Sequence, residues 1–302
     1  MKRLLKELYL LLWPFIDKLL FPTLKKFPWL LPDRSRFYLM HRIAGGRFNR
    51  YMTGKMGHFI GSVNGVPVGS KETILRTSIM RPEDVERQDN LDEYFMSGYE
   101  QMLDWMQLLE RHSFNLRTAR AIMEFGCGSA RLICHLRCID GVRLIGCDLN
   151  RENVAWSQQN IPGVEFYLND LRPPLSFAEN DSLDLVFAAS VFTHIPLETQ
   201  HLWIQEMYRI LRPGGFFLAD VLGHYHQKMM LSPDDLDSLR KEGQFTLDAT
   251  NPNSSHSTQI IGSWDVFQTR KEVLNAFGSV FHIHDYLPRG LDLLVLQKRP
   301  GV

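Results

Sequence analysis

Four residues in one short stretch could together hold a nucleotide. Glu124, Gly126 and Gly128 stand at the end of one apolar run, and Asp148 ends the next apolar run. Glycines let a backbone approach a ligand closely, and the start of a helix offers free N–H groups. An acid at the end of the second strand can accept hydrogen bonds from both hydroxyls of a ribose. The order and spacing predict a nucleotide-binding strand–helix–strand unit over residues 121–150.

The residue types in this unit favour a cationic ligand. Dinucleotide sites hold a pyrophosphate and require a glycine or alanine at a third fixed place, where this chain has Arg131. The Glu124 carboxylate would repel a pyrophosphate and attract a cation, a difference on the order of a few kcal/mol at a partly desolvated site. S-adenosylmethionine has no phosphate and carries a positive ammonium and a positive sulfonium. The pattern favours it over NAD; the alternative is that Glu124 is only a solvated strand-end residue.

Polar residues also follow the third and fourth predicted strands. Asn169 and Asp170 end an apolar run, at the edge where an adenine amino group would need an acceptor. Ser190 and His194 follow the next run. His194 is the first candidate for a general base that orients or deprotonates a methyl acceptor. The alternative is a structural histidine that helps to cap the next helix.

Two further histidines, His224 and His226, follow the fifth predicted strand and are second choices for the catalytic role. A metal held by these two and His194 is disfavoured, because no acidic ligand stands at a fitting spacing. We therefore predict no metal site.

The elements that position these residues alternate between buried strands and amphipathic helices, which is typical of an α/β fold with a parallel sheet. An amphipathic helix at 91–112 should cover the edge of the sheet and lead into the first strand. Helical spacing follows Gly128, and Asn150 should cap a helix to residue 159. The predicted parallel strands are 121–125, 142–147, 164–168, 182–190 and 216–222. Later helices are predicted at 198–211 and 267–277. The last two strands, 280–286 and 291–297, should form an antiparallel hairpin.

The chain has 302 residues, and its 34 basic residues balance 34 acidic ones, so bulk charge does not indicate a nucleic-acid partner. Its four cysteines fall within the nucleotide-binding unit: Cys127, Cys134, Cys138 and Cys147. Cys134 and Cys138 could form a metal pair, but small, buried, reduced side chains are the better interpretation. That usage indicates a reducing cytoplasm.

Several motifs together resemble class I S-adenosylmethionine-dependent methyltransferases, over roughly residues 85–302. These are Glu124-x-Gly126-x-Gly128, Asp148, Asn169-Asp170, Ser182-Leu-Asp-Leu-Val, Leu211-Arg-Pro-Gly-Gly and the terminal hairpin. The resemblance implies a Rossmann-like, doubly wound, seven-stranded sheet with an antiparallel terminal hairpin. It implies that Glu124, Gly126, Gly128, Asp148 and one of Asn169 or Asp170 bind the cofactor, and we add Arg131 and Ser190. The family usually has a third glycine where Ala130 stands. Residues 173–175 and 190–195 resemble a bacterial subgroup that acts on small molecules, in part in glycan or secondary-metabolite pathways.

The N-terminal third has a different composition. Residues 1–32 are apolar and basic, and one helical face of leucines could lie on an anionic membrane surface, dock on its own domain or join a second subunit. The longest uncharged apolar run there is too short to span a bilayer, and no signal-peptide cleavage pattern follows it. Residues 33–84 are basic and glycine-rich, with a hairpin turn at Val63-Asn64-Gly65-Val66. This basic cluster could face an acidic substrate, phospholipid head groups or only solvent.

A long insertion at 224–266 should lie over the site as a lid that meets the acceptor. The predicted activity is methyl transfer from S-adenosylmethionine to an oxygen or nitrogen of a small-molecule, glycan or lipid-linked acceptor, in the cytoplasm or at the inner membrane surface. A catalytically silent S-adenosylmethionine-binding subunit and, more weakly, an NAD-dependent oxidoreductase are the alternatives. No nucleic-acid partner is expected, and residues 1–32 could support membrane contact or a homodimer.

Overall fold

The computed structural model describes residues 61–63, 66–68, 91–137, 139–248 and 264–299. The chain divides into two units, Met1–Gly61 and Ser62–Val302. The predictions for residues 1–32, and most of those for 33–84, therefore lie outside the described residues. β1 (Gly61–Val63) and β2 (Val66–Val68) pair in a two-stranded sheet, and the turn predicted between them at Asn64-Gly65 lies outside the described residues.

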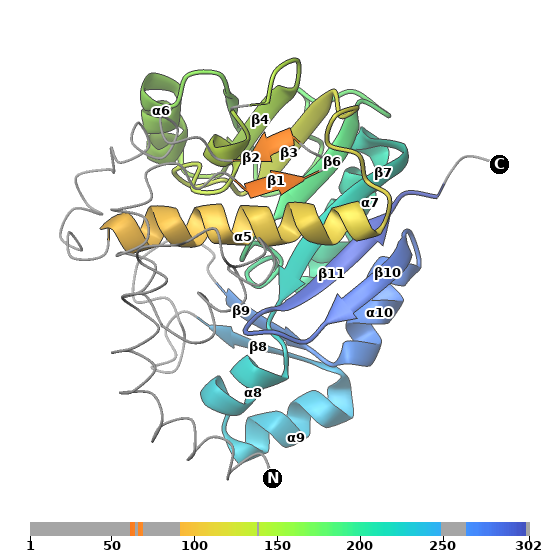
Figure 1. The fold of residues 1–302 in the computed structure, drawn as a ribbon. Coiled ribbons are helices and arrows are strands. Elements are labelled where there is room, and N and C mark those ends of the chain that lie inside the picture. Colours follow the sequence, from red (N-terminus) through yellow and green to blue (C-terminus); the bar gives the residue numbers. More distant parts are fainter. Residues whose placement is uncertain (1–60, 64–65, 69–90, 138, 249–263, 300–302) are drawn as a thin grey trace, which may run out of the picture. The chain divides into compact units, whose positions relative to one another are not determined.

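The main sheet has seven strands in the order β10-β11-β7-β6-β3-β4-β5 (Figure 1). Five strands run parallel, and β11 pairs antiparallel with both β7 and β10. The predicted doubly wound sheet with a terminal hairpin is confirmed. The strands are β3 (Ala121–Phe125), β4 (Arg143–Asp148), β5 (Glu165–Leu168), β6 (Leu183–Ala188), β7 (Leu211–Val221), β10 (His282–Leu287) and β11 (Asp292–Gln297).

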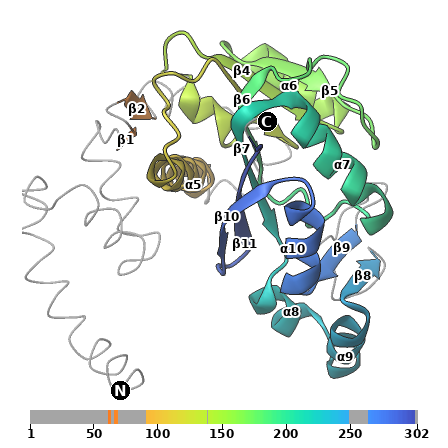
Figure 2. The same ribbon diagram turned by 90° about the vertical axis from the view of Figure 1, so that its right-hand side faces the viewer.

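Helices cover both faces of this sheet. Figure 2 shows α5 (Leu91–Arg111) on one side of the strands and α7 (Leu197–Ile210) with α10 (Arg270–Gly278) on the other. The spacing of Met102, Trp105, Met106 and Leu109 makes one apolar face of α5, and all four are buried as predicted. The ring of Trp105 meets Phe187 of β6 edge-on, at 6.1 Å between centroids. α5 is thereby fixed over the centre of the sheet.

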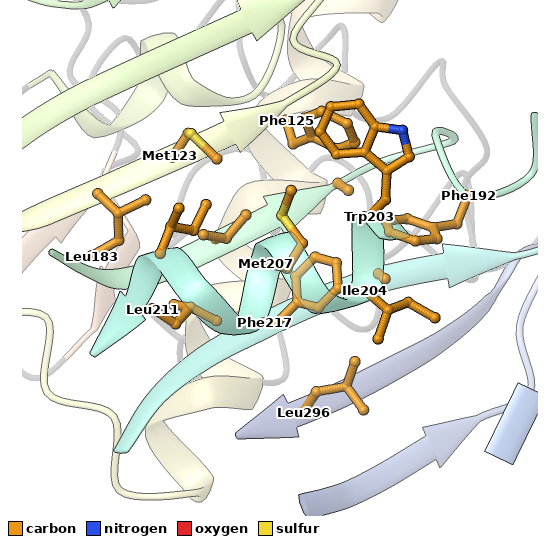
Figure 3. Packing of buried hydrophobic residues seen from close by; sticks show 14 of the residues in the cluster. Met123, Phe125, Leu183, Phe192, Trp203, Ile204, Met207, Leu211, Phe217 and Leu296 are labelled. Atoms are coloured by element: carbon orange, nitrogen blue, oxygen red, sulfur yellow. The ribbon is translucent and has the colours of Figure 1, made fainter. Parts of the chain in front are cut away.

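The core between the sheet and α7 is rich in aromatic and sulfur-containing side chains (Figure 3). Phe125 of β3 lies 4.6 Å from Trp203 of α7, measured between ring centroids. Met207 and Phe217 are fully buried in the same cluster. Each such side chain contributes about 1.5–3 kcal/mol by burial. The strands that carry the candidate site are therefore held from beneath by a dense core.

The helix predicted after Gly128 is shorter than expected. Turns lead into a single 3-10 helix, η3 (Ile133–Leu136), whose four residues are all buried. α6 (Arg151–Asn160) follows the prediction, because the Asn150 side chain accepts hydrogen bonds from the N–H groups of Glu152 and Asn153. Of the four cysteines, Cys127, Cys134 and Cys147 are buried thiols in no disulfide, as predicted, and Cys138 lies outside the described residues.

The insertion at 224–266 has structure of its own at the carboxyl end of β7 (Figure 1). It contains α8 (His224–Met230), α9 (Pro233–Glu242) and the antiparallel pair β8 (Gln244–Asp248) and β9 (Trp264–Gln268). A separate apolar cluster joins it to the domain: Leu222, Leu231, Leu239, Leu247 and Phe267. Among the helices of the described residues, none combines the length and the apolar character that crossing a membrane requires.

Candidate functional site

Three acidic side chains reach the same face of the sheet near its carboxyl edge. Glu124 of β3 lies beside Gly146 of β4 in the parallel register, and side chains alternate, so Asp148 shares the face of Glu124. Counting in the same way through β6 places Asp220 of β7 on this face too. The first two acids were predicted to meet; Asp220 was not predicted.

The glycine loop between β3 and η3 packs tightly against the loop that follows β6. Gly126 has a φ of +70°, and a Cβ on it would lie 2.4 Å from Cγ2 of Val191. Gly128 has a φ of +52° and has open space beside it. Ala130 also has a positive φ, +63°, so it occupies a conformation that suits glycine. The loop therefore needs Gly126 for both space and conformation.

Asp148 ties the glycine loop to the end of β4. Its Oδ2 accepts a hydrogen bond from Gly128 N–H at 2.7 Å, and its Oδ1 accepts one from Asn150 N–H at 2.8 Å. A carboxylate can accept about four hydrogen bonds, so each oxygen keeps room for a hydroxyl. The side chain is half-buried. Asp148 can thus hold the loop and accept two ribose hydroxyls at once.

Glu124 is buried, with 3% of its surface exposed, so the interpretation as a solvated strand-end residue is wrong. Its Oε2 accepts a hydrogen bond from Ile133 N–H of η3 at 2.9 Å. Burial raises the pKa of Glu124 to about 8, against the opposing effects of this hydrogen bond and of Arg131, while Asp148 adds to the increase. At neutral pH this acid is therefore mostly protonated until a cation approaches it.

Arg131 provides a positive charge near two of the acids, Glu124 and Asp220. Its Nη2 donates to Oε1 of Gln101 on α5 at 2.8 Å. Its charge lowers the pKa of Glu124 and of Asp220, although burial is the largest effect on both and raises the pKa of Asp220 to about 7. Asp220 also accepts a hydrogen bond from Ser190 N–H at 2.6 Å, and Ser190 has a φ of +56°. The structure therefore links the two predicted residues Arg131 and Ser190 through Asp220.

The end of β5 combines polar and apolar groups. Asn169 is buried, and its Oδ1 has no hydrogen-bond partner among the described residues, whereas Asp170 is exposed. Leu168 and Leu171, close to it in the chain, expose 39% and 61% of their surface. Leu149 exposes 48% and follows Asp148, the β4 residue whose carbonyl oxygen accepts from Asn169 N–H. Sequence reasoning named only polar residues here. Leu149 could have been found, because it directly follows the ribose-binding candidate Asp148 and faces no predicted core.

His194 is held by the insertion. Its Nδ1 lies 2.9 Å from the carbonyl oxygen of Trp264 and 3.6 Å from Oδ1 of Asp265, both on β9. A backbone hydrogen bond from Val266 N–H to Thr193 O, at 2.8 Å, joins the same two segments. Asp265 is fully buried, and no local pattern in the sequence indicates its contact with a histidine 71 positions earlier in the chain.

His224 is the exposed first residue of α8, and His226 has a buried Nδ1 without a partner among the described residues. Leu222, just before α8, forms a β-bridge with Phe267. Phe267 lies three residues, about 10 Å, along β9 from Trp264, whose carbonyl oxygen contacts His194. Within the described residues, no group of three or more histidine, cysteine or acidic side chains could hold a metal ion. The structure does not bring the three histidines to one metal-binding point.

Comparison with known proteins identifies the family. Residues 123–219, from β3 to β7, match the model of a family described as a methyltransferase domain. This match assigns residues 123–219 to a methyltransferase domain, in agreement with the predicted class I S-adenosylmethionine-dependent methyltransferase. Its cofactor is therefore S-adenosylmethionine, in agreement with the sequence prediction.

Solved structures with similarity to this methyltransferase domain come from several organisms. A SAM-dependent methyltransferase from Methanosarcina mazei has 19% identity and a TM-score of 0.46, over 64% of this chain and 98% of that chain. One from Mesorhizobium loti has 15% identity and a TM-score of 0.43, over 64% and 96%. A TehB-like SAM-dependent methyltransferase from Corynebacterium glutamicum has 14% identity and a TM-score of 0.43, over 73% and 100%.

The contact of Gly126 with Val191 can be tested through stability. We expect Gly126→Ala to lower the free energy of unfolding by more than the roughly 1–2 kcal/mol that a left-handed conformation costs a residue with a Cβ. Gly214→Ala is the matched control, because Gly214 has a φ of +80° but nothing within 4 Å of its added Cβ. Urea unfolding of both variants measures the difference. Equal losses would show that the clash with Val191 is relieved at no cost.

The raised pKa of Glu124 predicts how stability depends on pH. The folded protein keeps this proton up to about pH 8, whereas an unfolded glutamate loses it near 4.5, so the stability contribution is full below 4.5 and lost as pH rises through 8. We expect Glu124→Gln to remove the loss between pH 7 and 8, measured by urea unfolding at several pH values. Asp220→Asn should instead change the slope below about pH 7. The same slope in Glu124→Gln and wild type above pH 7 would contradict the assignment.

Proposed function

We propose that the chain is an enzyme that transfers a methyl group from S-adenosylmethionine to an oxygen or nitrogen of a small-molecule, glycan or lipid-linked acceptor. The observation that supports this most directly is the contact of the Asp148 carboxylate with Gly128 N–H, on the same face of the sheet as Glu124. A glycine loop, a strand-end acid and a buried acid below them are the parts that a positively charged nucleoside requires.

The residues present fit this cofactor. Asp148 has free acceptor capacity for the ribose diol. The unpartnered Oδ1 of Asn169 suits the adenine amino group better than the exposed Asp170, and the exposed leucine side chains near it offer an apolar surface for the ring. Gly128 leaves the backbone of the loop accessible, and Gly126 lets the loop pack against Val191. Arg131 offers a positive charge that suits the carboxylate of the methionine part, and the approach of its ammonium would favour the ionised form of the neighbouring Glu124.

S-adenosylmethionine, when bound, supplies an electrophilic methyl group on a positively charged sulfur. The protein then has to align the acceptor, exclude water and, where the acceptor bears a proton, take that proton. His194 is the candidate for the last role, since it follows β6 at the carboxyl edge of the sheet. His224 stays a second choice, because its place at the exposed start of α8 brings it to no described group of the site.

The insertion is the candidate for acceptor recognition. It packs on the loop after β6 through the bond between Val266 and Thr193, so it lies beside the residues assigned to the cofactor. Its described part contains the helices α8 and α9 and an apolar cluster of its own, so this part is more than a simple loop. We propose that this insertion and residues 33–84 determine which acceptor is methylated.

The decisive test of this function is calorimetry with S-adenosylmethionine, S-adenosylhomocysteine and NAD. We expect binding of the first two and none of NAD; binding of NAD alone would overturn the proposal. Transfer of label from methyl-labelled cofactor into a cell extract then tests turnover. Cofactor binding without any incorporation would favour a catalytically silent subunit.

Asp148 provides a quantitative prediction. Asp148→Ala should weaken S-adenosylmethionine binding by roughly 1.5–3 kcal/mol, about 10- to 150-fold in Kd, because hydrogen bonds to a charged group are lost. Asp237→Ala is the control: this carboxylate is 73% exposed on α9, where it pairs only with a neighbouring arginine among the described residues. Calorimetry measures both variants. An unchanged Kd for Asp148→Ala would remove this residue from the site.

A further inference from the structure

The two ring nitrogens of His194 have different surroundings. A carbonyl oxygen can only accept, so the 2.9 Å contact with Trp264 O requires a proton on Nδ1. In the neutral ring, the unprotonated nitrogen is then Nε2. The His194 side chain is 28% exposed, whereas Asp265 behind it is completely buried. The ring is thus fixed in the tautomer that a general base needs.

Asp265 lies where it can stabilise a positive charge on that ring. Its Oδ1 is 3.6 Å from Nδ1, within ion-pair distance although too far for a hydrogen bond. A carboxylate within about 4–6 Å favours the charged form of an imidazole, and burial strengthens the effect. Two backbone oxygens also contact this residue: Trp264 O on the ring and Val191 O on His194 N–H. Asp265 is therefore a charged group that the fold places behind the ring.

We propose that Asp265 is a positioning residue that orients His194 and stabilises its protonated form, so that His194 takes the proton from the methyl acceptor. This rests on the proposed function. The acceptor's lone pair forms the bond to the methyl carbon, and the carbon–sulfur bond breaks with its electron pair on sulfur. The acceptor's proton passes to Nε2 of His194 and from there to water. The insertion thereby completes a catalytic pair on a loop of the methyltransferase sheet.

The first test needs no acceptor. In the full-length protein labelled with ¹⁵N-histidine, His194, assigned by comparison with His194→Gln, should show the Nδ1–H tautomer. It should titrate above the ordinary histidine midpoint of about 6.5. Asp265→Asn should lower that midpoint by roughly one pH unit or more while the tautomer persists, because Trp264 O remains. A wild-type midpoint at or below 6.5, or an unchanged midpoint in folded Asp265→Asn, would overturn the proposal.

Asp285→Asn is the matched control. It removes the carboxylate from another Asp–His pair, in which His112 Nε2 lies 2.6 Å from Asp285 Oδ2 at the sheet edge. We expect it to leave the His194 titration unchanged. A shift of the His194 midpoint in this variant as large as in Asp265→Asn would also count against the pair. If Asp265→Asn does not fold, the wild-type tautomer and midpoint still decide.

Binding and turnover separate this proposal from the proposed function. Asp265→Asn should bind S-adenosylmethionine with wild-type Kd and incorporate label into extract at least ten-fold more slowly at high pH. The loss should be smaller at low pH, where the raised midpoint keeps the wild-type ring protonated. Failure of the wild type to bind the cofactor would reject the methyltransferase function but leave the histidine titration interpretable. Normal binding and undiminished incorporation in Asp265→Asn would reject the role of Asp265 alone.

Discussion

The parallel register of β3, β4, β6 and β7 is the constraint on which the candidate site depends. It fixes which side chains share a face, and it brings Glu124, Asp148 and Asp220 to the same edge. Acids gathered in this way would repel one another if all were ionised. Burial keeps Glu124 largely protonated, Arg131 offsets part of the charge, and backbone N–H groups from three loops complete the balance. The strand register therefore brings the acids together, and the glycine loop supplies one of the N–H groups that they bind.

This balance suits a cationic ligand. A positive group near Glu124 would favour the ionised carboxyl, so binding and proton release are coupled there. The hydrogen bond of Ile133 N–H to Glu124 means that the acid also supports η3, the element that follows the glycine loop. The buried acid therefore links the geometry of the loop to the charge of whatever occupies it.

The insertion contacts the loop that follows β6, on the other side of this loop from the glycine turn. β9 lies against the loop after β6, where Val191 meets Gly126 and His194 meets Trp264. One loop thus contacts both the glycine turn and the insertion. A change in the glycine turn or in the insertion would therefore shift the position of His194. This loop connects the cofactor-binding residues to the part proposed to recognise the acceptor.

The sequence by itself determined the doubly wound sheet, its antiparallel hairpin, the amphipathic face of α5, the cap at Asn150 and the cofactor class. These follow from local periodicity, from residues at strand ends and from short motifs, each of which acts over a few neighbouring positions. Only the tertiary structure decided that Glu124 is buried, that Arg131 lowers the pKa of Asp220, and that Asp265 lies behind His194. Those facts depend on strand register and on the packing of segments distant in the chain, which no local pattern encodes.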